Sequence, residues 1–447
     1  MREIVLHDTR SGELQALRPR EEGRVGIYAC GPTVYSRIHI GNARPFVVFS
    51  LLKRFLEHEG HAATLVINVT DVNDKIYDAA REAGRDSAEL AAEMTAQYRA
   101  DTDALGLGRP DREPLASETI GPIVDYIEAL VDSGHAYASG GDVYFRVRSD
   151  PSYGSLSHRQ LEHMDQGEEL DGANLKEDPL DFALWKAHKP SEDTVWESPW
   201  GPGRPGWHIE CSAMAEQLLG VGFDIHGGGS DLVFPHHENE AAQTRAARGR
   251  ELARLWMHNG MIQFTGEKMA KSVGNIALLS EVLGQYDAAT VLMYLISGHY
   301  RQPLAFSEAV LDQAQANVSR IREAGRQLSP GDSPAELERL RDAFFDALAR
   351  DFNTPEALSI MNEWLREAGK WDSPGDSHLR EMLGVLGLED LLAPAAQAPE
   401  EVVELARRRE QARSSRDFAA ADELRGEISE RGWEVRDGPE GFELLPS

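Results

Sequence analysis

A strand, loop, helix and strand pattern near the start of the chain constrains the fold more than any other feature of the sequence. Residues 25–29 form a short apolar run, and large apolar residues recur at helical spacing between Phe46 and Leu56. Residues 64–70 then form a run with the composition of a β-strand. This pattern predicts a βαβ unit in a parallel sheet, whose ligands bind at the carboxyl ends of the strands.

The chain is long enough for several domains. At about 150 residues per domain, its 447 residues predict about three. We expect an α/β fold in which a Rossmann-like parallel-sheet domain is split into 1–113 and 201–250 by an insertion at 114–200. The rest is expected to comprise a loop-bearing region, a helical bundle and a small mixed α/β tail, at 251–306, 307–398 and 399–447.

Two local patterns in the second half of the sheet domain carry further expectations. The segment 222–226 predicts a strand, and the glycines at 227–229 predict a turn after it. A helix is expected from about Asp231. From about Asp287 onward, the pattern predicts almost only helix.

Composition limits the compartment but leaves nucleic acid open. The chain begins without an apolar signal region, and no segment approaches the roughly 18 apolar residues of a membrane span. We therefore expect a cytoplasmic protein that does not enter a membrane. The net charge of −29 argues against general binding to polyanions. A local cluster near the C-terminus predicts either contact with RNA or an ordinary solvated helix face: Arg407, Arg408, Arg409, Arg413 and Arg416.

The two cysteines lie among residues that bind metals. Cys30 precedes a Gly-Pro loop, and Cys211 follows Gly206-Trp207-His208-Ile209-Glu210. His236 and Glu240 are four residues apart, a spacing that places both on one face of a helix. Two cysteines are too few for a disulfide framework. Thiolate, imidazole and carboxylate are the ligands that a tetrahedral zinc site takes.

Two glycine-containing loops have the composition of a nucleotide site. The first ends in His39-Ile40-Gly41-Asn42, where a strand gives way to a helix. Helix N-termini attract phosphate, and imidazole and amide groups donate to phosphate oxygens as charge develops. The second loop carries Lys268 and Lys271 among Gly, Ser and Asn, which favours a cationic clamp for the β and γ phosphates of ATP. Either loop alone has an ordinary explanation, but both in one α/β chain indicate ATP chemistry.

Taken together, these segments closely resemble bacterial cysteinyl-tRNA synthetase, a class I aminoacyl-tRNA synthetase. The resemblance lies in Cys30-Gly31-Pro32-Thr33-Val34-Tyr35, in 39–42, in 206–214, in 226–240 and in the Lys268 loop. It continues through Asp351-Phe352-Asn353-Thr354-Pro355-Glu356-Ala357 and 417–422. It implies an enzyme that activates L-cysteine with ATP as cysteinyl-adenylate and passes it to the terminal adenosine of cysteine tRNA. It also implies a monomer, with a KMSKS-type loop and stem-contact region at 251–306, a DALR-like bundle at 307–398 and an anticodon-binding tail at 399–447.

The resemblance also implies a role for each candidate residue. One Zn²⁺ per chain would be held by Cys30, Cys211, His236 and Glu240. Four residues would be catalytic: His39, Asn42, Lys268 and Lys271. ATP with Mg²⁺ would contact these four together with Gly41, Gly229 and Asp231. The substrate cysteine would contact Thr70, Trp207 and Asp231.

A metal explains how cysteine is told from serine, which differs by one atom. An ordinary pocket separates near-isosteres by only about 100-fold, whereas discrimination by a metal–sulfur bond that a hydroxyl cannot match can reach on the order of 10⁴-fold.

The residues leave two alternative interpretations open. Four protein ligands are typical of a structural zinc site, and Trp207 also fits a core position.

The chain departs from the general class I pattern at two positions. Asn42 replaces the final histidine of the usual His-Ile-Gly-His signature, and Ala270 replaces the serine between the two lysines. Asparagine still donates a hydrogen bond, and both lysines are present, so we expect activity.

Two other functions compete with this interpretation. The cysteine ligase of mycothiol synthesis forms the same adenylate but passes cysteine to an amino-sugar, and it lacks a full anticodon-binding region. The long segment from about Asp287 to Ser447 favours tRNA as the acceptor. A non-catalytic, zinc-stabilised RNA-binding protein is the other alternative, but such a protein needs no ATP clamp.

Overall fold

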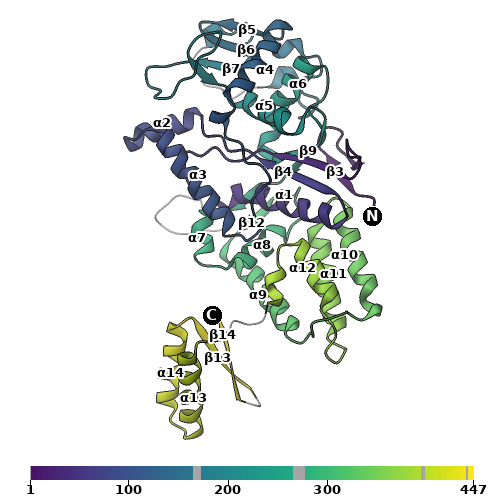
Figure 1. The fold of residues 1–447 in the computed structure, drawn as a ribbon, viewed down its shortest axis with the longest axis vertical. Helices are drawn as coiled ribbons and strands as arrows, with labels where there is room; N and C mark the ends of the chain where they lie inside the picture. Colours follow the sequence, from purple (N-terminus) through teal and green to yellow (C-terminus); the bar gives the residue numbers. More distant parts are fainter. Residues whose placement is uncertain (1, 165–172, 265–276, 394–397, 439–440, 447) are drawn as a thin grey trace. The chain divides into compact units, whose positions relative to one another are not determined.

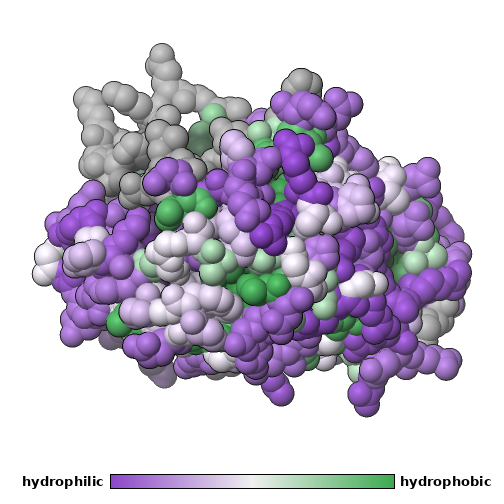
Figure 2. All heavy atoms as spheres, turned by 90° about the horizontal axis from the view of Figure 1, so that it is seen from above, coloured by the Kyte–Doolittle hydropathy of each residue, from purple (hydrophilic) through white to green (hydrophobic). Residues whose placement is uncertain are grey.

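The computed structural model describes residues 2–164, 173–264, 277–393, 398–438 and 441–446. The chain divides into two compact units, Met1–Leu391 and Leu392–Ser447. Within the described residues, no helix has the length and apolar character that crossing a membrane requires. Figure 2 shows one face of the molecule, on which apolar residues form small groups separated by hydrophilic ones.

The first unit is built on a four-stranded parallel sheet (Figure 1). Its strands follow the order β10 (Ala253–Asn259), β9 (Phe223–Gly229), β3 (Arg24–Ala29) and β4 (Ala62–Ile67). Helix α1 (Ile40–His58) joins β3 to β4 and packs against the sheet with a broad apolar face. The predicted βαβ unit and parallel sheet are confirmed.

The glycines at 227–229 do not form the predicted turn. They continue β9 and pair with β10, where Gly227 lies opposite Met257. A Cβ atom on Gly227 would lie 2.0 Å from Cζ of Phe49, which projects from α1. These glycines therefore allow a close approach of helix and strand, and the prediction of a turn was wrong for that reason.

The helix expected from about Asp231 begins later. Helix α6 spans Glu238–Arg248, and residues 230–237 form two short irregular turns instead. Phe234 has an extended backbone (φ −141°, ψ 134°). Because the residue before a proline is disfavoured in helix, Pro235 explains why a regular helix cannot start earlier. His236 thus precedes α6, while Glu240 lies in its first turn.

A second, antiparallel sheet belongs to the inserted segment. It contains β5 (Ala136–Ser139), β6 (Asp142–Phe145), β7 (Phe182–Ala187) and β8 (Gly203–Pro205) in that order. Helices α2 (Asp74–Ala83), α3 (Ser87–Asp103) and α4 (Ile120–Asp132) precede it, and α5 (Trp207–Leu219) follows it. Strands β8 and β10 lie just beyond the bounds expected for the insertion and for the second half of the sheet domain.

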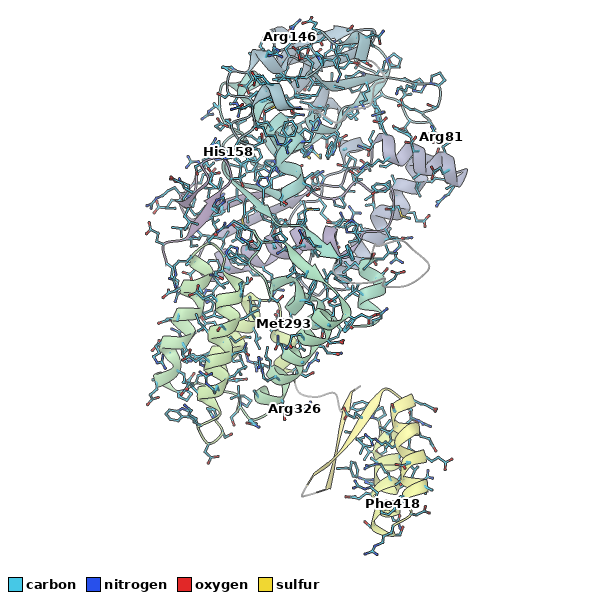
Figure 3. All side chains as sticks on the ribbon, turned by 180° about the vertical axis from the view of Figure 1, so that it is seen from behind. Arg81, Arg146, His158, Met293, Arg326 and Phe418 are labelled. Carbon is cyan, nitrogen blue, oxygen red and sulfur yellow. The ribbon has the colours of Figure 1, made fainter. Side chains whose placement is uncertain are left out.

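The remainder of the first unit is mainly helical, as predicted. Its helices are α7 (Leu279–Leu283), α8 (Ala288–Ile296), α9 (Glu308–Gly325), α10 (Glu338–Ala349), α11 (Thr354–Ala368) and α12 (Ser377–Val385). Short strands β11 (Ile262–Phe264) and β12 (Leu304–Phe306) pair in parallel. In Figure 3, Arg146 marks the inserted sheet at one end of this unit, and Met293 of α8 lies in the opposite half. A hairpin of β1 (Val5–Asp8) and β2 (Glu13–Ala16) starts the chain.

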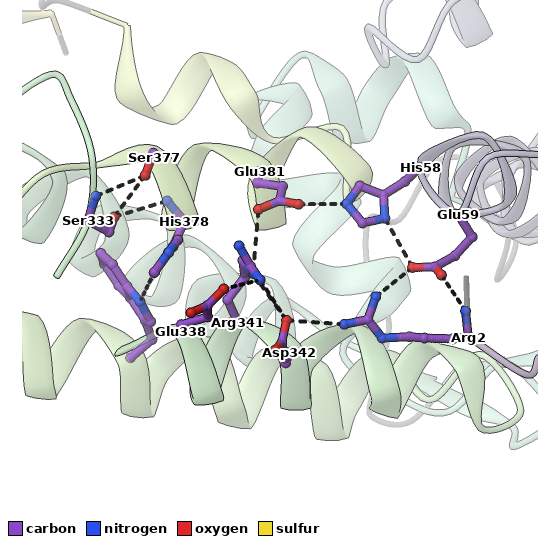
Figure 4. A network of polar contacts seen from close by, with 11 residues as sticks. Arg2, His58, Glu59, Ser333, Glu338, Arg341, Asp342, Ser377, His378 and Glu381 are labelled. Carbon is purple, nitrogen blue, oxygen red and sulfur yellow. Dashed lines mark hydrogen bonds and ion pairs between the residues drawn. The ribbon is translucent and has the colours of Figure 1, made fainter. Parts of the chain in front are cut away.

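Polar contacts join the end of α1 to the helical region (Figure 4). Arg2 pairs with Glu59 at 2.8 Å and with Asp342 of α10 at 3.3 Å. His58 contacts Glu381 of α12 at 2.8 Å. These contacts fix the C-terminal end of α1 against α10 and α12.

The second unit is the small mixed α/β fold expected at the C-terminus. Helices α13 (Glu400–Ser414) and α14 (Phe418–Glu430) pack on the antiparallel pair β13 (Trp433–Gly438) and β14 (Gly441–Pro446). Its apolar core contains Val402, Leu405, Ala406, Leu424, Ile428, Trp433 and Val435. The unit therefore has a core of its own.

Candidate active site

Four side chains of types that can bind a metal, from distant parts of the sequence, meet beside the carboxyl end of β3. We call Cys30, Cys211, His236 and Glu240 the thiol cluster; one ligand atom from each lies within 4.8 Å of the others, and all four side chains are buried. Cys30 directly follows β3, and Cys211 lies in α5. His236 and Glu240 come from the start of α6 and the turn before it. The structure thus brings together the four residues that the sequence resemblance had selected.

The spacing of these atoms fits a tetrahedral zinc ion. Bonds of roughly 2.3 Å to sulfur and 2.0 Å to nitrogen or oxygen place neighbouring ligand atoms about 3.3–3.8 Å apart. The two sulfur atoms are 3.7 Å apart, and Cys30 Sγ is 3.6 Å from Glu240 Oε1. His236 Nε2 is 3.1 Å from the same oxygen. The donor set and its spacing therefore suit Zn²⁺ without rearrangement of the backbone.

A second group of donors overlaps the first. His226 and His237 lie with Cys30 and Glu240 inside the same 4.8 Å limit. His226 Nε2 is only 2.8 Å from Glu240 Oε2, a hydrogen-bonding distance that is too short for two ligands of one ion. His226 is therefore placed to orient Glu240, and His236 is the better placed of the two to ligate an ion.

Burial keeps the two thiols and the His236 imidazole of the cluster uncharged when no cation is bound. It raises the pKa of the Cys30 thiol well above its ordinary value, and Cys211 adds to the rise. A hydrogen bond with Cys30 opposes the shift at Cys211, but burial still leaves the pKa of Cys211 raised. Burial also lowers the pKa of His236 to about 3. A bound cation would reverse the preference of the two thiols, because it stabilises thiolates.

Sequence reasoning missed the histidines around the cluster. His208 Nδ1 lies 3.1 Å from His236 Nδ1, and His237 Nε2 lies 3.3 Å from Cys30 Sγ. His237 in turn contacts His258 at 2.7 Å. The available signal was sequence adjacency, since His208 follows Trp207 and His237 follows His236. Such neighbours fix the orientation of metal ligands.

Trp207 and Thr70 lie beside this cluster or its loop. The Trp207 ring stacks on His236 with centroids 4.3 Å apart, and the residue is only partly buried, so it is not an ordinary core tryptophan. Thr70 is buried and exchanges backbone hydrogen bonds with the loop after Cys30, through Pro32 and Val34. Its hydroxyl accepts a hydrogen bond from Asn68 at 3.3 Å.

The signature turn, residues 39–42, caps helix α1. Asn42 N–H donates to His39 Nδ1 at 3.3 Å, and His39 N–H donates to Asn42 Oδ1 at 3.2 Å. This reciprocal pair is a capping box, which gives Asn42 a structural role that the sequence analysis did not foresee. A Cβ atom on Gly41 would lie 2.8 Å from the His39 ring, so glycine leaves room for that ring.

Gly229, the last residue of β9, and Asp231 in the turn after it extend this site. Burial lowers the pKa of His39, and the charge of Asp231 opposes that shift, so the two side chains share one electrostatic environment. A Cβ atom on Gly229 would lie 2.3 Å from Asp231 Oδ1. The absence of a side chain at 229 thus leaves space for the Asp231 carboxylate.

Lys268 and Lys271 lie outside the described residues. The next described segment nevertheless contacts the signature turn, since Ile40 N–H donates to the Ala277 carbonyl at 3.0 Å. Leu279 N–H donates to the Ile38 carbonyl at the same distance. Residues 277–279 therefore lie beside the start of α1.

Comparison with known proteins identifies the family. Residues 16–316 match the class I (C) tRNA synthetase catalytic domain. Residues 395–442 match the cysteinyl-tRNA ligase anticodon-binding domain. A cysteine–tRNA ligase of Cronobacter sakazakii is 44% identical over 455 residues, which cover 98% of each chain. The chain belongs to the cysteine–tRNA ligase family. A cysteine–tRNA ligase of Caldicellulosiruptor saccharolyticus is 41% identical and covers 98% of this chain and 99% of the relative.

Solved structures of other synthetases share the fold of this cysteine–tRNA ligase family member. Methionyl-tRNA synthetase of Mycobacterium tuberculosis, in complex with methionyl-adenylate, matches with a TM-score of 0.58 at 17% identity, covering 89% of this chain and 96% of that one. An Agrobacterium radiobacter leucyl enzyme, in a ternary complex with tRNA, matches with a TM-score of 0.57 at 13% identity, covering 85% and 84%. At these identities the likeness concerns the fold alone.

Proposed function

We propose that the protein is a cysteine–tRNA ligase that joins L-cysteine to cysteine tRNA at the expense of ATP. In the first step, the cysteine carboxylate attacks the α phosphorus of ATP, and pyrophosphate leaves. In the second, the terminal adenosine hydroxyl attacks the carbonyl of the adenylate, and AMP leaves. The observation that carries this proposal is the buried thiol cluster at the carboxyl end of a class I parallel sheet, in a chain of this family.

Substrate selection is assigned to the thiol cluster. Cys30, Cys211, His236 and Glu240 would hold Zn²⁺, which when bound would ligate the substrate sulfur and favour its thiolate. Trp207, stacked on His236, would then border the cysteine, and Thr70 and Asp231 would complete its pocket. A serine hydroxyl is a poorer ligand, so discrimination would not require a separate hydrolytic site.

Adenylate formation is assigned to the signature turn and the two lysines. The N-terminal end of α1, with its helix dipole, and the His39 ring would face the ATP phosphates, with Gly41 leaving room for that ring. Asn42 would donate its amide hydrogens while its oxygen caps the helix. Lys268 and Lys271 would stabilise charge on the α phosphate and on departing pyrophosphate, alongside the Mg²⁺ that accompanies ATP.

Cysteine tRNA is the proposed acceptor, and the second unit supports it. Arg407, Arg408, Arg413 and Arg416 are exposed there, whereas Arg409 is buried. Phe418, which begins α14, is 63% exposed (Figure 3). Exposed arginines beside an exposed aromatic ring suit a nucleic-acid strand with unstacked bases.

We also propose that the protein is a cytoplasmic monomer. Light scattering of the purified protein would test its oligomeric state.

Charging assays decide between tRNA and other acceptors. Purified cysteine tRNA, ATP and Mg²⁺ would be incubated with labelled cysteine, beside an identical reaction with serine. We expect charging with cysteine only. Cysteine-dependent pyrophosphate exchange without tRNA charging would instead support the amino-sugar ligase. RNA binding without exchange would support a non-catalytic RNA-binding protein.

A further inference from the structure

Asp351, at the start of the Asp351-Phe352-Asn353-Thr354 segment, joins three parts of the first unit. Its Oδ1 accepts hydrogen bonds from the His7 N–H at 2.9 Å and the Tyr300 hydroxyl at 2.7 Å. Its Oδ2 accepts from Arg301 Nε at 2.7 Å. The residue is 5% exposed. A single buried carboxylate thus links β1, the residues around 300 and the connection between α10 and α11.

The backbone of Asp351 and Phe352 is strained, and this conformation places the Asp351 carboxylate among its three hydrogen-bond donors. Asp351 has φ +60° and Phe352 has φ +47°. Such values are uncommon outside glycine, and they are costly for a bulky residue such as phenylalanine. Strain of this kind persists where surrounding contacts over-determine the conformation. The ring of Phe352 is buried, 6.2 Å from the ring of Phe55 in α1.

The segment 299–302 continues this connection to α1. Arg44 of α1 is fully buried, and its guanidinium donates to the carbonyls of Gln302 at 2.9 Å and His299 at 3.2 Å. It also donates to the carbonyl of Gly260, which follows β10. Burial lowers the pKa of Arg44 to about 10, so the guanidinium stays charged at neutral pH. A buried guanidinium with carbonyl partners holds its position firmly, because losing any partner would leave a buried donor unsatisfied.

The segment 299–302 packs tightly against the end of β10. Gly260 N–H donates to the Tyr300 carbonyl at 2.7 Å. A Cβ atom on Gly260 would lie 2.4 Å from the carbonyl carbon of Gln302. Any displacement of 299–302 would therefore shift the carbonyls that hold the Arg44 guanidinium. Arg44 lies two residues after Asn42 in the first turns of α1.

We propose that Asp351 is a positioning residue for adenylate formation, acting through the segment 299–302 and Arg44 on the signature turn. This inference rests on the proposed function, because it concerns the turn that would face ATP. Displacement of a reacting group by about 1 Å can cost on the order of 100-fold in rate. The contacts in Figure 4 reach the opposite end of α1 and do not provide this control.

The test is a double-mutant cycle between Asp351→Asn and Arg44→Lys. Asp351→Asn would turn an amide N–H₂ group toward Arg301, and Arg44→Lys would keep the charge but remove the forked donor. We expect Asp351→Asn to lower kcat of cysteine-dependent ATP–pyrophosphate exchange about tenfold, with unchanged KM for cysteine and unchanged zinc content. Because both act along one path, the double variant should lose little more than the worse single variant. Assays would run at a temperature where circular dichroism shows every variant to be folded.

Asp376→Asn is the matched control. Asp376 is 7% exposed, accepts from the Gly331 N–H at 3.2 Å and pairs with Arg380, so its contacts lie within the helical region. It should lower thermal stability while leaving exchange within about twofold of wild type, and its effect should simply multiply with that of Arg44→Lys. If Asp351→Asn does not fold, Tyr300→Phe, which removes only one hydrogen bond to Asp351, replaces it with an expected fall in kcat of about threefold.

Three results would overturn the proposal: normal exchange by the folded Asp351 or Tyr300 variant, an equal loss in Asp376→Asn, or losses in the cycle that multiply fully. A wild-type protein that lacks cysteine-dependent exchange would instead overturn the proposed function. The two failures are therefore distinguishable.

Discussion

The thiol cluster and the signature turn lie in the same unit but are built in opposite ways. The cluster gathers Cys30, Cys211, His236 and Glu240 from widely separated segments, and each is at most 7% exposed. The signature turn is one contiguous tetrapeptide, partly exposed, and held by its own capping box. Selection of a small thiol needs a dry, fixed set of ligands, whereas ATP must enter and pyrophosphate must leave. Under the proposed assignments, each substrate would therefore meet the kind of site that suits it.

Cys211→Ser should separate the two regions most sharply. We expect loss of bound zinc and a fall in kcat/KM for cysteine of about 1000-fold, with reduced preference over serine, because the remaining three donors leave the ion incomplete. Metal analysis and pyrophosphate exchange with each amino acid measure both effects. Far-ultraviolet circular dichroism should be unchanged, since the parallel sheet does not depend on this side chain.

Ser212→Ala is the control for that variant. Ser212 is equally buried next to Cys211, but its hydroxyl donates to Gln243 instead of facing the cluster. It should keep its zinc and its selectivity. Cysteine activation at wild-type rates by zinc-free Cys211→Ser would disprove selection by a metal.

Lys271→Ala should produce the converse pattern. Removing one cation from the proposed phosphate clamp is expected to slow single-turnover adenylate formation about 100-fold. Zinc content and the preference for cysteine over serine should not change, because the variant leaves the thiol cluster intact. Rapid-quench measurement of adenylate, beside metal analysis, tests both. Normal adenylate formation would remove Lys271 from the mechanism.

The contrast between the two regions also explains what the sequence could predict. The βαβ unit, the helical second half and the mixed tail follow from local periodicity, so they were predicted correctly. The prediction of a turn at 227–229 was wrong. The glycine at 227 is required there because the Phe49 ring packs against the strand, and Phe49 is far away in the sequence. The delayed start of α6 had a local cause in Pro235, which the periodicity analysis did not weigh.

The site divides along the same line. The tetrapeptide at 39–42 is enough by itself to predict a helix N-terminus, although the capping role of Asn42 is seen only in the structure. No spacing rule joins Cys30 to Cys211, since tertiary packing brings the two together, and only the family resemblance paired them. His226 and His258 were missed because a histidine whose polar partners are brought to it by tertiary packing has no sequence pattern of its own.

Substitutions of Asn42 should sharpen the account of the signature turn by separating its two roles. Asn42→Ala removes both the cap for His39 N–H and the amide donor, so we expect about tenfold slower adenylate formation and a loss of about 1 kcal/mol in unfolding free energy. Asn42→Asp keeps an oxygen for the cap but places a negative charge beside the phosphates. It should unfold like wild type while losing at least as much activity.

Chemical denaturation and pyrophosphate exchange at varied ATP measure the two roles. Equal stability of the alanine and wild-type proteins would show that the capping box does not stabilise α1. Full activity of Asn42→Asp would exclude a phosphate contact at this position.

The smallest effect concerns protons, and it tests the buried cluster alone. In the metal-free protein both thiols have raised pKa values and are protonated at neutral pH. His236, with a pKa of about 3, is already neutral there and would release no proton when it binds zinc. Binding of zinc by two thiolates should therefore release about two protons, and zinc affinity should rise with pH through the neutral range. Calorimetric zinc titration in two buffers of different ionisation enthalpy gives this number. A release of about one proton from the wild-type protein would place one of the two thiols outside the site.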